Sequence, residues 1–84
     1  MINKILVEVY VPTIEKKYDV LLPINKKIHQ IISLMVKAIN ELCGGYYTPS
    51  TMPILYDKLT AKPYDVNLSL ASSDIRNGTE LILM

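Results

Sequence analysis

The feature that most constrains the fold is a single stretch of helical periodicity in the middle of the chain. Apolar side chains recur there at the spacing of one helix face, at Ile28, Ile31, Ile32, Met35, Ile39 and Leu42. We expect a helix from about Lys26 to Cys43, with Asn25 as its N-cap. Gly44 and Gly45 should end it, because glycine takes the left-handed conformation after a helix without a Cβ clash. A lone amphipathic helix must bury its apolar stripe against another layer.

The segments on both sides of this helix show the two-residue alternation of β-strands, so they supply that layer. Strands are expected at 4–11, 17–22, 54–56 and 79–84. The first two are separated by a short connection at Pro12, which favours an antiparallel hairpin. The segment 58–67 adds a turn and at most one short edge strand. Residues 68–74 form a loop or a single helical turn that places Leu70 in the core.

This order of elements predicts an α+β fold of the β-grasp (ubiquitin-like) type. It has a mixed sheet of four or five strands, with one long helix packed on one face. The last strand lies parallel to the first in the centre of the sheet. Eighty-four residues supply one hydrophobic core, so we expect a single domain, residues 1–84.

Composition and charge exclude several classes of function. Nine basic and eight acidic residues are interleaved, so there is no basic stripe for a nucleic acid. Every apolar stretch is broken well short of the ~20 residues that membrane insertion requires. The chain begins a strand almost at once, without a secretory signal, and Cys43 is its only cysteine. We therefore expect a soluble protein of a reducing compartment, the cytoplasm.

The residues that carry chemistry do not assemble into a catalytic pattern. At a helix C-terminus the helix dipole disfavours a thiolate on Cys43, and the only histidine, His29, lies near the other end of that helix. One histidine and one distant cysteine fall short of a zinc site. The acidic residues occur singly, and no glycine-rich loop is present to hold a phosphate. We expect no enzyme activity, no metal, no cofactor and no small-molecule substrate.

Apolar residues are expected on both faces of the sheet. Those facing the helix are Ile5, Val7, Val9, Tyr18, Val20, Leu22, Ile54, Tyr56, Leu81 and Leu83. Those facing away from it are Leu6, Leu21, Leu55, Ile82 and Met84. Five apolar side chains on adjacent strands form a contiguous patch, which is typical of an interface. We predict that this outward patch, rimmed by Glu8, Lys58 and Arg76, binds a protein partner or a second copy of the chain.

Three short motifs carry a resemblance to ubiquitin-fold proteins. They are Pro-x-Asn before the helix, Ile-Leu-Tyr in the third strand, and Ser-Asp-Ile-Arg-Asn-Gly-Thr at 73–79. Over residues 4–84 the chain resembles the YukD-like family, small bacterial ubiquitin-like proteins associated with type VII (WXG-type) secretion systems. The members are regarded as accessory binding components and not as enzymes. The resemblance implies a cytoplasmic interaction module with that role.

Two alternatives remain beside the interaction module. A ubiquitin-like modifier or sulfur carrier needs a free C-terminal Gly-Gly, whereas this sequence ends at Met84 within its expected last strand and has its Gly44-Gly45 pair inside the chain. Conjugation to targets is therefore not expected. The other alternative is a structural homodimer. The sequence leaves open the partner, the oligomeric state and the role of the loop 46–52.

Overall fold

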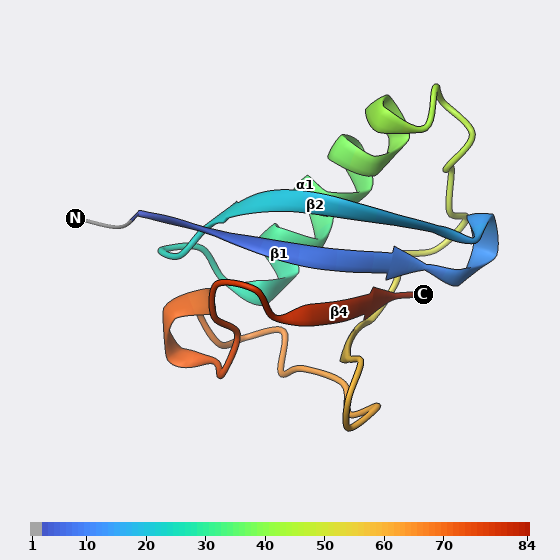
Figure 1. Ribbon diagram of the computed structural model, residues 1–84. Coiled ribbons are helices and arrows are strands. Elements are labelled where there is room, and N and C mark those ends of the chain that lie inside the picture. The colour runs from blue at the N-terminus through green and yellow to red at the C-terminus, as the bar shows by residue number, and fades with distance from the viewer. Residues whose placement is uncertain (1–2) are drawn as a thin grey trace.

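The computed structural model describes residues 3–84, which form a mixed sheet with one α-helix across it (Figure 1). The regular elements are β1 (Lys4–Val11), η1 (Pro12–Ile14), β2 (Lys16–Pro23), α1 (Ile28–Leu42), β3 (Leu55–Asp57), η2 (Leu70–Ser72) and β4 (Glu80–Leu83). Strand order is β2-β1-β4-β3. The pair β1–β4 is parallel, and the pairs β1–β2 and β3–β4 are antiparallel. The predicted β-grasp, with its last strand beside the first, is confirmed.

The hairpin of β1 and β2 is regular along its whole length, from Val11 opposite Lys16 to Lys4 opposite Pro23. The 3₁₀ turn η1 reverses the chain, and Glu15, at a positive φ of 52°, donates its N–H to the Pro12 carbonyl at 3.2 Å. Alternation along β1 buries every second side chain, so the expected strand 4–11 matches the observed one.

The helix α1 begins two residues later than predicted, and its N-cap is Lys27 rather than Asn25. Backbone carbonyls from a distant loop satisfy its first turn. Ile28 donates its N–H to the Leu68 carbonyl at 2.8 Å, and His29 donates to the Val66 carbonyl at 3.1 Å. These tertiary bonds supply the acceptors that the prediction had assigned to the Asn25 side chain.

The end of α1 is where the sequence placed it. Gly44 and Gly45 have φ of 79° and 92°, a region that a Cβ disfavours. Their N–H groups donate to the carbonyls of Glu41 at 3.3 Å and Asn40 at 2.8 Å. The glycine pair is therefore the C-terminal cap of the helix.

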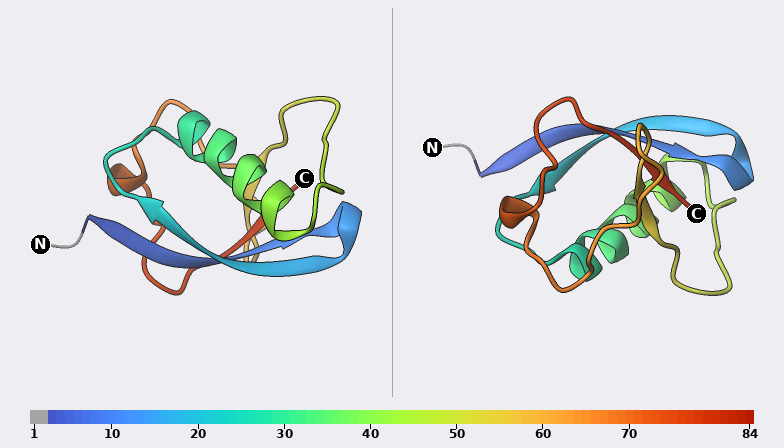
Figure 2. Two further views of the ribbon diagram at one scale, coloured as in Figure 1. Left: turned by 90° about the horizontal axis from the view of Figure 1, so that it is seen from above. Right: turned by 90° about the horizontal axis from the view of Figure 1, so that it is seen from below.

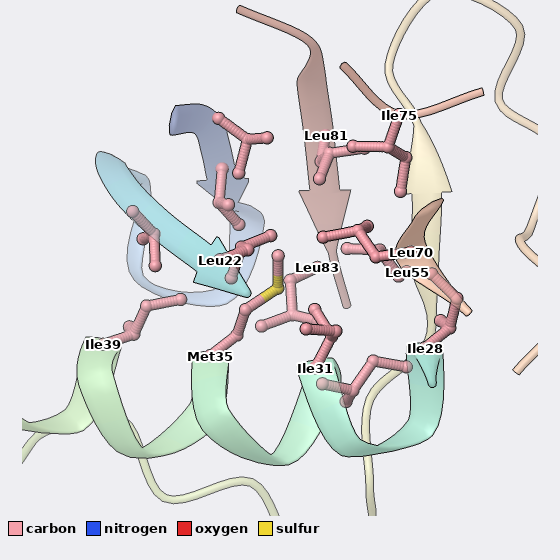
Figure 3. Packing of buried hydrophobic residues seen from close by; sticks show 14 of the residues in the cluster. Leu22, Ile28, Ile31, Met35, Ile39, Leu55, Leu70, Ile75, Leu81 and Leu83 are labelled. Atoms are coloured by element: carbon pink, nitrogen blue, oxygen red, sulfur yellow. The ribbon is translucent and has the colours of Figure 1, made fainter. Parts of the chain in front are cut away.

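The core lies between α1 and one face of the sheet. Figure 3 shows helix side chains directed at strand residues, with Leu70 and Ile75 beside Leu55 and Leu81. The fully buried members with the largest side chains are Leu22, Ile28, Ile31, Met35, Ile39, Leu55, Leu70, Ile75, Leu81 and Leu83. The predicted burial of Leu70 is confirmed. Leu42 is an exception to the predicted stripe, because it lies beside Tyr18 and Tyr46 at the rim and is 60% exposed.

The segment after β3 runs back along that strand. The N–H of Asp57 donates to the Lys62 carbonyl, and the N–H of Tyr64 donates to the Leu55 carbonyl, both at 3.0 Å. Only an isolated bridge between Tyr56 and Pro63 results, so the possible edge strand in 58–67 does not form among the described residues. No helix in residues 3–84 has the length and apolar character needed to cross a membrane.

Candidate protein-binding face

The sheet face turned away from α1 carries a row of apolar side chains across three strands. Figure 2 shows α1 on one side of the sheet only. Ile82 of β4 lies between Tyr10 of β1 and Tyr56 of β3, and residues opposite one another share a face. Ile54 and Met84 exchange backbone hydrogen bonds of 2.8 and 3.1 Å and are 46% and 54% exposed. We call Tyr10, Ile54, Tyr56, Ile82 and Met84 the outer cluster.

Leu55 does not belong to this face, and its predicted place there was wrong. It is 1% exposed and its side chain lies in the core (Figure 3). Leu55 pairs with Leu83, which faces α1, and paired residues point the same way. Ile54 and Tyr56, predicted to face the helix, take the outward positions instead. The predicted strand, Ile54-Leu55-Tyr56, is apolar throughout and shows no alternation, so its two faces were assigned one residue out.

The predicted patch is also not contiguous. Leu6 and Leu21 lie opposite one another, both exposed on the outer face, and form a second, smaller group. The Leu6 carbonyl accepts a hydrogen bond from the N–H of Gly78 at 2.7 Å, so the turn before β4 lies beside it rather than Ile82. The sequence placed these residues on the correct face but could not show the distance between the two groups.

An acidic row separates the two apolar groups. Glu8 is paired with Asp19 on one side and with Glu80 on the other, so three carboxylates cross the outer face in line. Two lysines offset them: Lys17 lies 3.4 Å from Glu8, and Lys58 lies 3.8 Å from Glu80. The row depends on the parallel register of β1 and β4, which alternation within either strand does not reveal.

Of the three residues predicted to rim the patch, two form surface ion pairs and the third does not. Glu8 and Lys58 take part in the ion pairs just described. Arg76 instead folds over its own turn, where its Nη1 donates to the carbonyls of Ser73 at 2.6 Å and Ile75 at 2.8 Å. Its guanidinium therefore holds the turn before β4 in shape.

A hollow of about 520 Å³ adjoins the outer cluster at Ile54 and Met84. It lies between η1 and the loop 46–52, whose role the sequence left open. Tyr47 anchors this loop: it is buried, and its carbonyl accepts a hydrogen bond from Asn40 Nδ2 at 2.6 Å. Met52, in the same loop, is exposed at the mouth. The outer cluster therefore continues into a concave surface.

The side chains that could carry chemistry either pack within the domain or lie exposed on its surface. Cys43 is half-buried, its thiol within 3.5 Å of the Asn40 carbonyl, and His29 is exposed on α1. Within residues 3–84, no three His, Cys, Asp or Glu side chains converge as a metal site would need. Burial, then the charges of Asp74 and Asp57, raise the pKa of Tyr64 far above its usual value. Burial also raises the pKa of Tyr47.

Similar folds occur among solved structures, whereas no family model and no curated protein matches the chain. The ubiquitin-like domain of EccD1, a type VII secretion system protein of Mycobacterium tuberculosis, aligns with a TM-score of 0.74 and 19% identity over 98% of each chain. The fold is ubiquitin-like. The EccD5 ubiquitin-like domain of Mycobacterium xenopi gives a TM-score of 0.79 and 20% identity, over 96% of this chain and 92% of that one.

Larger assemblies contain the same ubiquitin-like fold. A chain of the MycP5-free ESX-5 inner membrane complex aligns with a TM-score of 0.80 and 20% identity over 99% of this chain, which spans only 21% of that one. A chain of a toluene 4-monooxygenase complex also aligns, with a TM-score of 0.75 and 10% identity. The resemblance inferred from the sequence is thus confirmed for the fold, and the fold by itself serves several functions.

Proposed function

We propose that this chain is a non-catalytic ubiquitin-like interaction module, an accessory component of a bacterial type VII secretion system that acts in the cytoplasm. The observation that carries this proposal is the outer cluster, a group of aromatic and aliphatic side chains that α1 leaves uncovered. Contiguous apolar surface of this kind marks interaction sites. The likeness to the EccD1 and EccD5 domains supports the choice of a secretion system.

The proposed mechanism is recognition by a rigid surface. Tyr10 and Tyr56 flank Ile82 on three hydrogen-bonded strands, so little conformational entropy is lost when a partner covers them. Tyrosine suits such a position because its ring is apolar and its hydroxyl is polar. Ile54 and Met84 extend the contact toward the hollow beside the loop 46–52. Leu6 and Leu21 offer a second contact beyond the acidic row.

We also propose that the module acts without becoming covalently attached to targets. Gly44 and Gly45, the only adjacent glycines of the sequence, are engaged as the cap of α1. The lone thiol of Cys43 sits at the C-terminal end of that helix and donates to the Asn40 carbonyl at 3.5 Å. These features support a role in binding rather than in group transfer.

Affinity capture from the native cells, read by mass spectrometry, tests the proposal. Ile82→Asp places a charge in the outer cluster, and Leu34→Asp is the matched control on the exposed surface of α1. Secretion components should be recovered with the wild type and Leu34→Asp, and lost with Ile82→Asp. Their retention by a folded Ile82→Asp chain would overturn docking on the outer face. Recovery of unrelated proteins would overturn the secretion role, and covalent adducts would overturn the non-covalent one.

A further inference from the structure

The two edges of the sheet differ in what covers them. At the β3 edge, the segment 62–64 runs alongside the strand. Its Lys62 carbonyl accepts a hydrogen bond from the N–H of Asp57, and its Tyr64 N–H donates to the Leu55 carbonyl. The opposite edge is β2, eight residues long, from Lys16 to Pro23. A long edge strand exposes a row of backbone donors and acceptors on which another strand can pair. The open edge of β2 is therefore the place to look for an interface.

The hydrogen-bond pattern identifies which residues of β2 are open. Ile24 donates its N–H to the Asn3 carbonyl at 3.0 Å, and bonded pairs alternate along an antiparallel ladder. Even-numbered residues of β2 thus pair with β1, while the backbone groups of Lys17, Asp19 and Leu21 point away from it. Within residues 3–84, none of these three N–H groups donates to a side chain or loop.

We propose that β2 pairs antiparallel with β2 of a second copy of this chain, about a two-fold axis at Tyr18. Lys17 then lies opposite Asp19 of the second copy, and Asp19 lies opposite its Lys17. Both are bonded pairs, so four backbone hydrogen bonds and two opposite-charge pairs form together. The stretch Lys17-Tyr18-Asp19 is complementary to itself, which is the charge pattern that a two-fold interface requires.

Other antiparallel registers within β2 are less favourable. Centring the axis on Lys17 or Asp19 places two like charges directly opposite one another. Centring it on Val20 or Leu21 brings Pro23 into a bonded position, and proline has no N–H to donate. An axis between two residues would oppose an outward side chain to an inward one. The axis at Tyr18 avoids all three faults.

The surface beneath this edge also fits a second copy. Tyr18 lines a hollow of about 620 Å³ together with Leu42 and Tyr46, which are 60% and 83% exposed. In the proposed pairing the two Tyr18 residues face each other at the axis, above these apolar side chains. The outer cluster lies on β1, β3 and β4 and stays uncovered. The pairing is therefore independent of the proposed docking face, and the joined sheet presents two outer clusters.

A charge-swap experiment followed by sedimentation velocity tests the pairing. The wild type should show a concentration-dependent monomer–dimer equilibrium. Lys17→Asp and Asp19→Lys each convert two opposite-charge pairs into two like-charge pairs. Each should lower the association constant on the order of tenfold to a hundredfold. An equimolar mixture of the two variants should restore association as a one-to-one heterodimer, because both pairs become complementary again.

Each other outcome overturns the pairing. A wild type that stays monomeric at millimolar concentration excludes the second copy. Variants that dimerise as well as the wild type move the interface away from β2. Folded single variants whose mixture does not associate contradict the register at Tyr18. Ile82→Asp should keep the wild-type dimer while losing its captured partners, so failure of this pairing and failure of the docking face are distinguishable.

Discussion

The two faces of the sheet are built from the same strands, yet their side chains have different surroundings. Ile54 and Leu55 are neighbours in the sequence, but Ile54 is 46% exposed and Leu55 is 1% exposed. The inner face packs against α1 in one buried hydrophobic cluster and holds the fold together. The outer face has no such constraint, and its apolar side chains need a reason other than folding. The difference separates residues that stabilise the domain from residues available for recognition.

The largest effect on stability should come from shortening a buried side chain of the inner face. Leu55→Ala removes a fully buried side chain that projects from β3 into the core and should lower the free energy of unfolding by about 2–5 kcal/mol. Ile54→Ala, the matched change one residue away, should cost less than about 1 kcal/mol because its site is already hydrated. Urea unfolding followed by circular dichroism measures both. Equal losses for the two variants would break the distinction between the faces.

A smaller effect, confined to alkaline pH, should come from Tyr64 at the border of the inner layer. Burial, with the nearby Asp74 and Asp57, raises the pKa of its phenol in the folded state above the unfolded value of about 10. The folded protein therefore holds this proton more tightly, so its stabilising contribution is complete below about pH 10 and is lost as pH rises from there.

Urea unfolding at pH 8 and pH 11 measures this loss. Tyr64→Phe should flatten the decline, and Tyr47, whose pKa burial also raises, should account for part of the remainder. If Tyr64→Phe lost as much stability between pH 8 and pH 11 as the wild type, the Tyr64 phenol would have the same pKa in the folded and the unfolded chain. That result would contradict the prediction.

The smallest effect should lie on the outer face. Asp19 is directly opposite Glu8, a like-charge pair, and Lys17 offsets only Glu8 at 3.4 Å. Asp19→Asn should therefore raise the free energy of unfolding at low salt by about 0.2–1 kcal/mol. The gain should vanish in about 1 M salt, where charges on the surface are screened. A destabilised variant would mean that the acidic row is already neutralised.

The inner face could be predicted from the sequence because alternation and helical periodicity are local. Both hairpin strands, the helix stripe up to Ile39 and the burial of Leu70 follow from such patterns. The helix start could not, since its cap comes from the carbonyls of Val66 and Leu68. The registers of the strands could not be predicted from local patterns either, because pairing between distant segments determines them. That is why Leu55 was assigned to the wrong face.

The side of the sheet that carries the outer cluster could be predicted from the sequence, but not all of its residues. Ile82 and Met84 were identified, but the flanking tyrosines, Tyr10 and Tyr56, were missed. Tyr56 could have been found had β3 been placed one residue later against β4, and Tyr10 from the alternation along β1. The acidic row at Glu8 needed the parallel register as well.

Site-specific photo-crosslinking tests most directly whether the outer cluster is the docking face. A benzophenone amino acid in place of Tyr56 puts an aromatic probe inside the cluster, and the same probe in place of Leu34 samples the exposed surface of α1. In native cells, the probe at position 56 should yield adducts with type VII secretion components, while the probe at 34 should not. Adducts with those components at 34 and none at 56 would contradict the assignment of the outer face.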